Sequence, residues 1–167
     1  LDNTACNLAS INLMKFRKQD GSFDCQGFKA ASRIFFIAQE ILVDRASYPT
    51  DQIAANSHAF RPLGLGYSNI GTLAMTSGLP YDSDGAYGLC GSLTSLLHGM
   101  ANRTSAEMAG VVGTFERYEE NREPFMHVMQ MHRDAVEDIN DAGPACLKDA
   151  AREVWEEVLE LGAKNGF

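Results

Sequence analysis

Apolar side chains recur every three or four residues along most of this chain, and no other feature constrains its fold more tightly. Such spacing is typical of helices that bury one face. It predicts six helices, over residues 25–46, about 50–58, 69–76, 83–109, 121–139 and 146–161. Asp24 is a suitable N-cap for the first helix, Asp82 or Ser83 is one for the fourth, and Gly143-Pro144 ends the fifth. Since there is no internal repeat, low-complexity segment or linker, the sequence predicts one mainly α-helical unit over residues 1–167.

Two of these stripes predict which side chains are buried. In the first helix the spacing joins Phe28, Ala31, Phe35, Ala38 and Leu42. We expect that set to line the buried face of the helix. In the fifth helix His132 falls within the apolar stripe, which predicts a hydrogen-bonded core histidine in preference to a ligand. His98 has no second ligand four residues away, so metal binding there is unsupported.

One segment lacks the helical spacing and is predicted to form a short buried strand. In residues 4–13 (TACNLASINL), apolar side chains are interrupted by hydrogen-bonding ones. The polar side chains are Asn7, Ser10 and Asn12, and they need partners from the backbone, from other side chains or from a bound polar ligand. The thiol of Cys6 in this segment is either a small core group or a redox group, and composition does not distinguish the two.

Composition restricts the class of protein. The 167 residues are 45% hydrophobic and 22% charged, which are ordinary values for a globular protein with a real core. The net charge of −8 argues against a nucleic-acid surface, because phosphate binding relies on clustered Lys and Arg. No apolar stretch approaches the roughly 20 residues of a membrane span, and the chain starts without the features of a secretory signal. The default expectation is therefore a cytoplasmic protein.

The four cysteines lie far apart, at positions 6, 25, 90 and 146. No C-x-x-C pair occurs, so we expect no zinc site. A disulfide framework is not expected in a cytosolic chain of this size. Cys25, Cys90 and Cys146 fall in predicted helices, where structural roles are expected.

Two further patterns are expected to be structural. Gly64-x-Gly66-x4-Gly71 does not have the G-x-G-x-x-G spacing of a dinucleotide-binding loop, so we expect tight packing there. The adjacent carboxylates at positions 119–120 and 156–157 point in different directions on a helix. They predict solvated faces rather than an acid/base pair.

Four blocks, in order along the chain, carry a family resemblance. They are Cys6–Leu13 (CNLASINL), Arg61–Gly66 (RPLGLG), Arg103–Ala109 (RTSAEMA) and Met131–Val136 (MHRDAV). The first resembles the strand that bears the second redox cysteine of ribonucleotide reductase large chains, and the second resembles the block that follows it after one long helix. The third and fourth are similar to the adenosylcobalamin-dependent (class II) branch. The resemblance covers nearly all 167 residues.

The resemblance also implies a fold. The catalytic domain of that family consists of two half-barrels of parallel strands with helices outside. This chain then supplies a strand and outer helices of that α/β barrel, and we expect a mainly α structure with one or two short strands.

Two motifs of the family are absent from this chain. The radical-bearing cysteine of the family sits in an Asn-Pro-Cys-x-Glu motif, and none of the four cysteines has that pattern around it. The phosphate-binding loop, of the Pro-Thr-Gly-Thr type, is expected just after Phe167. The chain also begins with Leu1 rather than Met. The resemblance therefore implies an internal segment of the catalytic barrel, a single partial domain over residues 1–167 that is inactive by itself.

By the same resemblance, the parent enzyme reduces ribonucleotides to deoxyribonucleotides by thiyl-radical chemistry. Cys6 is then one member of a redox-active disulfide pair, whose partner lies upstream of this chain. Leu8, on the same face of the strand, lines the substrate floor. The complete enzyme uses adenosylcobalamin, a ribonucleotide substrate and a thioredoxin-type reductant. No cofactor or metal is expected in this segment alone, and no nucleic-acid or membrane partner.

Two alternatives stay open at this point. One is a class I reductase large chain, which takes its radical from a separate subunit. The other is a helical interaction or regulatory module without a catalytic role, which the acidic charge and the helical stripes suit equally well.

Overall fold

The computed structural model describes all residues, 1–167, and it is mainly α-helical, as the sequence predicts. Six α-helices are accompanied by two strands and one short 3-10 helix. In chain order the elements are β1 (Asn7–Asn12), η1 (Leu13–Phe16), α1 (Cys25–Arg45), α2 (Asp51–Phe60), β2 (Leu63–Ser68), α3 (Ile70–Thr76), α4 (Asp84–Val112), α5 (Tyr118–Ala135) and α6 (Ala145–Asn165). None of the helices combines the length and the apolar character that a membrane crossing needs.

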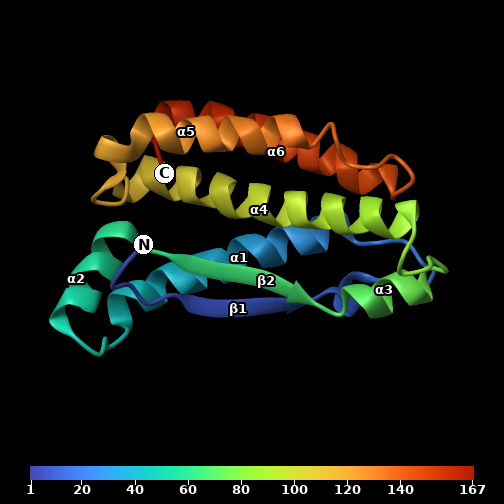
Figure 1. Cartoon of the computed structure of the whole chain (residues 1–167), viewed down its shortest axis with the longest axis horizontal. Helices are drawn as coiled ribbons and strands as arrows, with labels where there is room; N and C mark the ends of the chain where they lie inside the picture. The colour runs from blue at the N-terminus through green and yellow to red at the C-terminus, as the bar shows by residue number, and fades with distance from the viewer.

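The elements form two layers (Figure 1). In one layer β1 and β2 lie side by side with α1 behind them, and α2 and α3 lie at opposite ends of this sheet. In the other layer α4 runs the length of the molecule, with α5 and α6 on its outer side. Because α4 packs extensively against α6 and also against α1, it joins the two layers.

The two strands pair in parallel, with Leu8 opposite Gly64. Helices α1 and α2 form the crossover between them, as parallel strands require. The sequence predicts a buried strand, and β1 is buried on one face only. Leu8 is 80% exposed, whereas Ile11 is buried, because α1 covers only one face of the sheet.

Strand β2 was not located from the sequence. Gly64 and Gly66 lower the strand propensity of this segment, since glycine loses entropy on ordering and has no side chain to pack. Its pairing with β1, more than 50 residues earlier in the chain, holds it in place. The strand is therefore a product of tertiary contacts.

The starts of α1 and α4 follow the predicted capping chemistry. The side-chain oxygens of Asp24 and Ser83 accept hydrogen bonds from the backbone N–H groups of Gly27 and Ala86, at 3.1 and 3.2 Å. Each bond satisfies one of the donors that the first turn of a helix leaves unpaired. The positions at which α1 and α4 begin therefore follow from the local sequence.

The buried face of α1 differs from the predicted stripe. Phe35 and Leu42 are 41% and 51% exposed. The buried residues of α1 are instead Phe28, Ser32, Gln39 and Val43. Because α1 is apolar on more than one side, its spacing alone did not select the side that packs. As a result, a polar side chain of α1, Gln39, lies against the sheet.

Helix α5 also departs from the sequence prediction. It begins at Tyr118 rather than at Asn121, whose side-chain Nδ2 donates to the carbonyl of Arg117 one turn back at 2.8 Å. His132 is exposed rather than part of the core. Its ring stacks on Trp155, with the ring centroids 5.5 Å apart. His132 thus covers the ring of Trp155 and stays at the surface.

The main core lies between α4 and α6. Its fully buried side chains include Leu93, Leu96, Leu147, Val154 and Val158. The indole Nε1 of Trp155 donates to the carbonyl and the hydroxyl of Ser95, at 3.1 and 2.9 Å. Gly99 lets the two helices approach, because a Cβ atom there would lie 2.9 Å from Val154. Tertiary packing of this kind supports a helix that is otherwise weakened by its glycines.

Candidate functional site at Cys6

Cys6 lies one residue before β1, with an exposed, unbridged thiol. Its Sγ lies 3.6 Å from the carbonyl oxygen of Asn7. The predicted site residue is therefore at the entrance of the strand rather than within it. An exposed thiol beside an ordered strand can react with a partner that approaches from outside this chain.

Cys6 and Leu8 share one face, as predicted, and both side chains lie over Gly64 of β2. A Cβ atom at Gly64 would clash with the end of the Leu8 side chain and would lie 3.2 Å from the Cys6 sulfur. Glycine at position 64 therefore leaves the space that these two side chains occupy. This agrees with the expectation of tight packing in the Gly64-x-Gly66 segment.

Hydrogen bonds hold the backbone on both sides of Cys6. Before it, the N–H of Ala5 donates to the hydroxyl of Ser57, a fully buried residue of α2, at 2.9 Å. After it, Gln39 of α1 donates from Nε2 to the carbonyl of Asn7 at 3.0 Å. The backbone groups of Ala5 and Asn7 thus find partners among side chains of α2 and α1, one of the three sources that the sequence left open.

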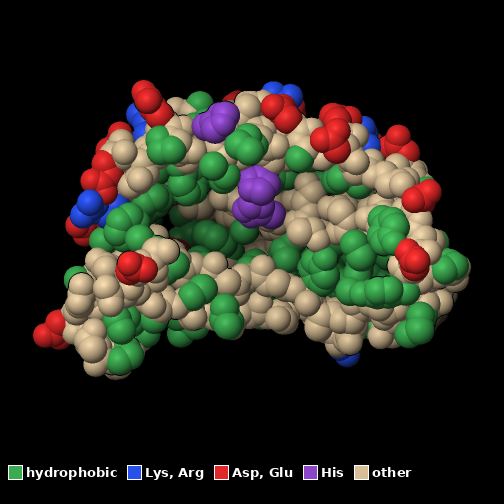
Figure 2. Space-filling view, in the orientation of Figure 1, with side chains coloured by type: hydrophobic (Ala, Val, Ile, Leu, Met, Phe, Trp, Pro, Cys, Tyr) green, Lys and Arg blue, Asp and Glu red, His purple; other side chains and the backbone are tan.

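A groove of about 740 Å³ lies between the two layers and is seen as the hollow in Figure 2. Arg61 at the end of α2 contacts both Glu40 and Asp44 of α1 there, the latter at 2.8 Å. The hydrogen bond from Arg61 lowers the pKa of Asp44 below its usual value. The positive charge of Arg61 is thus paired, and neither predicted site residue, Cys6 or Leu8, lines the groove.

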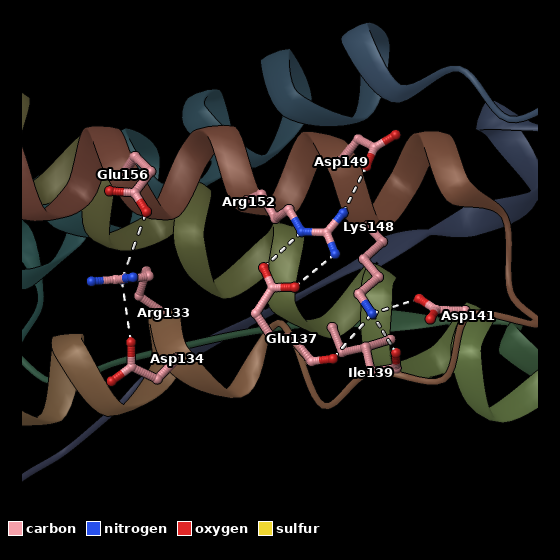
Figure 3. Close-up of polar contacts among 9 residues, drawn as sticks. All are labelled: Arg133, Asp134, Glu137, Ile139, Asp141, Lys148, Asp149, Arg152 and Glu156. Carbon is pink, nitrogen blue, oxygen red and sulfur yellow. Dashed lines mark hydrogen bonds and ion pairs between the residues drawn. The ribbon is translucent and has the colours of Figure 1, made fainter.

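A polar network joins the end of α5 to α6 (Figure 3). The buried Lys148 donates to the carbonyls of Glu137 and Ile139 and to the carboxylate of Asp141, at 3.2, 2.6 and 2.7 Å. Arg152 binds the Glu137 carboxylate through two contacts of 2.7 Å. Hydrogen bonds from Lys148 and Arg152 lower the pKa values of Asp141 and Glu137, respectively. Because each cation is fully paired, the adjacent cavity of about 250 Å³ holds no free positive charge for an anion.

Two histidines meet between α4 and α5. The ring centroids of His98 and His132 lie 4.4 Å apart, and both rings contact Trp155. Burial, with a smaller contribution from His132, lowers the pKa of His98 to about 4. No group of three or more His, Cys, Asp or Glu side chains in the chain is arranged to hold a metal ion. His98 is therefore neutral at neutral pH, and its contact with His132 is one of packing.

Three residues that contact the Cys6 segment were not predicted to belong to this site from the sequence, namely Gln39, Ser57 and Gly64. Ser57 had no distinguishing signal. Gln39 had a weak one: it lies at helical spacing from Phe28, Ser32 and Val43, so a buried polar face of α1 was present in the pattern but was outweighed by the larger apolar side chains. Gly64 was noticed as a packing residue, without its partners.

Comparisons with known proteins agree on one family. The model of the ribonucleotide reductase barrel domain matches residues 1–167. A vitamin B12-dependent ribonucleotide reductase of Rhodopirellula baltica is 72% identical over all 167 residues, and that of Streptomyces coelicolor is 44% identical over 177 aligned residues, also covering the whole chain. A ribonucleoside-diphosphate reductase large chain of Encephalitozoon cuniculi is 31% identical over 71% of the chain. The chain spans only 16%, 18% and 15% of these relatives.

Proposed function

The chain belongs to the ribonucleotide reductase barrel-domain family, and we propose on that basis that it is part of the large catalytic chain of a vitamin B12-dependent reductase that converts ribonucleotides to deoxyribonucleotides. The match over the whole chain supports this function over a non-catalytic helical module. The higher identity to B12-dependent relatives than to the large chain of Encephalitozoon cuniculi supports it over the class I alternative.

Within this reaction Cys6 serves as one of two reducing thiols. A thiyl radical elsewhere in the protein abstracts the 3′-hydrogen of the ribose. The bond between C2′ and its hydroxyl breaks, and two thiols supply two hydrogens and two electrons and become a disulfide. One hydrogen leaves with the oxygen as water, the other takes the place of the hydroxyl at C2′, and the abstracted hydrogen returns to C3′ and regenerates the thiyl radical. The second thiol belongs to an upstream segment of the parent chain, and a thioredoxin-type dithiol then restores both. Cα atoms about 4.4–6.8 Å apart are needed for such a bridge.

The observation that carries this role is the exposed Cys6 thiol beside an ordered strand. The backbone is held on both sides of it, at Ala5 and at Asn7. Leu8 projects beside Cys6 on the open face of β1 and forms an apolar floor for the sugar. Both side chains are exposed on the face of β1 that α1 does not cover.

Adenosylcobalamin supplies the initial radical in relatives of this type, and the residues of this chain do not fit a site for it. The buried side-chain polar atoms without a partner belong to Asn7, Arg17, Gln39, Tyr118 and Arg133. None of these five residues lines either the groove between the layers or the smaller cavity. The proposal therefore places the cobalamin site in other segments of the parent protein.

The test is substitution of single cysteines in the complete protein that contains this chain. Cys6→Ser stops multiple turnover with a thioredoxin-type reductant, because a hydroxyl cannot form the product disulfide. Radical formation survives, since it depends on a different cysteine. Turnover is assayed as deoxynucleotide formed, and the radical by electron paramagnetic resonance.

The matched controls are Cys25→Ser, Cys90→Ser and Cys146→Ser, whose cysteines lie on helices and not beside β1 in the sequence. Each keeps its turnover, with at most the modest stability loss of a polar group placed in a packed site. Normal turnover of Cys6→Ser, together with the loss of turnover in one of the three controls, is the result that refutes the assignment.

A further inference from the structure

We propose that Gln39 is a positioning residue for Cys6, an inference that rests on the proposed role of that thiol. Gln39 lies in the middle of α1, on the face packed against β1 and β2, and is only 3% exposed. It touches neither substrate nor reacting atoms in the proposed reaction. Its effect on Cys6 passes through the backbone of the two strands.

The side-chain amide of Gln39 bridges both strands at the Cys6 end of the sheet. Its Nε2 donates to the carbonyl of Asn7 in β1 and to the carbonyl of Gly64 in β2, each at 3.0 Å. Asn7 follows Cys6 directly, and Gly64 is the residue over which the Cys6 side chain lies. The side-chain amide of Gln39 thus fixes β1, which directly follows Cys6, relative to Gly64 of β2.

A third bond joins Asn7 and Gln39 in the opposite direction. The side chain of Asn7 donates from Nδ2 to the backbone carbonyl of Gln39 at 3.1 Å. The two residues therefore exchange hydrogen bonds between α1 and β1. Reciprocal bonds of this kind restrict rotation as well as distance, so the backbone beside Cys6 has little freedom to move relative to α1.

The backbone segment around Cys6 that needs this support is short. Cys6 precedes β1, so its own residue is outside the paired strand. Ala5, bonded to Ser57, holds it on one side, and Asn7, bonded to Gln39 and paired with Leu63, holds it on the other. A thiol that must meet a second thiol within bonding distance tolerates little displacement, and misplacement by about 1 Å reduces rates by up to roughly a hundredfold in other enzymes.

The buried amide is retained at an energetic cost. Its Oε1, and the Oδ1 of Asn7, are buried without a hydrogen-bond partner. A buried unpaired acceptor destabilises a protein, whereas an apolar side chain of similar size would leave no such oxygen. Gln39 differs from an apolar residue in that its amide donates one hydrogen bond to each of the two strands.

The experiment compares variants in the complete protein. Gln39→Met keeps the approximate size but removes both donors. Gln26→Met is the matched control, since Gln26 is an exposed glutamine on the same helix. We expect kcat of Gln39→Met to fall by roughly tenfold to a hundredfold with KM unchanged, and disulfide formation at Cys6 in a single turnover, read by mass spectrometry, to slow equally. Gln26→Met retains wild-type values.

A second variant keeps the test informative if Gln39→Met folds poorly. A buried carboxyl has a raised pKa, so Gln39→Glu is ionised and repelled by both carbonyls at high pH but protonated and able to donate one bond at lower pH. We expect its kcat, relative to the wild type at the same pH, to recover as the pH falls. A purely structural role predicts a lowered Tm in both variants without any change in kcat, KM or this pH profile.

The outcomes separate this inference from the proposed function. If Cys6→Ser is dead in multiple turnover while Gln39→Met and Gln39→Glu keep the wild-type kcat at every pH, Cys6 is a reducing thiol and the positioning role of Gln39 is wrong. If Cys6→Ser turns over normally, the proposed function and the inference fail together. Loss of kcat in Gln39→Met with pH-dependent recovery in Gln39→Glu supports both.

Discussion

At the scale of single residues, side chains in this protein take their properties from neighbours on other elements. Cys6 is held through Asn7 by a glutamine 33 positions later in the chain, and its space is left by a glycine of β2. His98 is neutral at pH 7 because it is buried beside Trp155 and His132. In each case the chemistry of one residue depends on contacts that are distant in sequence.

The lowered pKa of His98 predicts a pH-dependent stability. Its folded-state pKa of about 4 lies below the ordinary value of 6.5, so the unfolded chain takes up a proton first as the pH falls. The stabilisation is complete above pH 6.5 and is lost as the pH drops toward about 4. His98→Gln removes this part of the dependence, up to about 3 kcal/mol, in urea unfolding measured across that range.

The control for this prediction is His127→Gln, which changes an exposed histidine of α5. It retains the wild-type slope of unfolding free energy against pH. Since carboxylates also titrate in this range, the informative quantity is the difference between each variant and the wild type. An unaltered slope in His98→Gln would contradict the burial of its neutral form.

At the scale of elements, contacts between helix ends decide how the layers fit together. Helices α1 and α6 begin side by side, where the thiols of Cys25 and Cys146 are neighbours. Farther along, Lys29 and Glu153 pair at 3.4 Å between the same helices. The end of α5 is joined to α6 by the paired cations Lys148 and Arg152. These contacts tie together elements whose local sequences carry no sign of their partners.

The contact between Cys25 and Cys146 predicts a reversible disulfide between α1 and α6. Burial, with the neighbouring thiol, raises the pKa of Cys25 to about 11, so the exposed Cys146 reacts first with a low-molecular-weight disulfide and releases one thiol. Cys25 then displaces the second thiol and closes the bridge. Peptide mapping after treatment with oxidised glutathione detects the linked peptides, whereas Cys90, which has no thiol neighbour, forms no internal bridge. Mixed disulfides alone at Cys146 contradict this prediction.

The network at the end of α5 predicts unequal effects of its two cations. Lys148→Met leaves the carbonyls of Glu137 and Ile139 without their donor and lowers the free energy of unfolding by about 1–3 kcal/mol. Arg152→Gln removes a more exposed ion pair and costs less than about 1 kcal/mol. Chemical denaturation of both variants measures the difference. Equal decreases in the free energy of unfolding would show that the burial of Lys148 does not add to its contribution to stability.

At the scale of the whole molecule, apolar surface on α1 is left open in this chain. Ile34, Phe35, Ile41 and Leu42 are between 41% and 63% exposed. Exposed apolar patches of this kind mark surfaces that contact other protein. The chain spans about one sixth of the length of its Rhodopirellula relative, so we expect other segments of the parent protein to cover this face.

This expectation predicts a difference between the 167-residue chain and the complete protein. The isolated chain binds a hydrophobic dye such as anilinonaphthalene sulfonate, and the complete protein binds much less per mole. Phe35→Ser with Leu42→Ser reduces dye binding by the isolated chain, because both side chains are on the open face. Equal dye binding by the chain and the complete protein would show that this face stays open.

The sequence by itself determined the features that depend on neighbouring residues. Helix positions follow from the spacing of apolar side chains, and Asp24 and Ser83 marked two helix starts, because capping bonds join residues three apart. The four collinear blocks were enough to indicate the family and, through it, Cys6 as the redox candidate. Each of these conclusions needs only a short window of the chain.

Tertiary structure alone decided which sides of those elements meet. β2 exists as a strand because it pairs with β1, and its glycines gave no local sign of it. The spacing in α1 favoured the large apolar residues, but the sheet selected the face with Gln39, since its amide satisfies two strand carbonyls. His132 lies at the surface, where its ring stacks on Trp155 of α6. Partner choice is a long-range property, and local periodicity does not encode it.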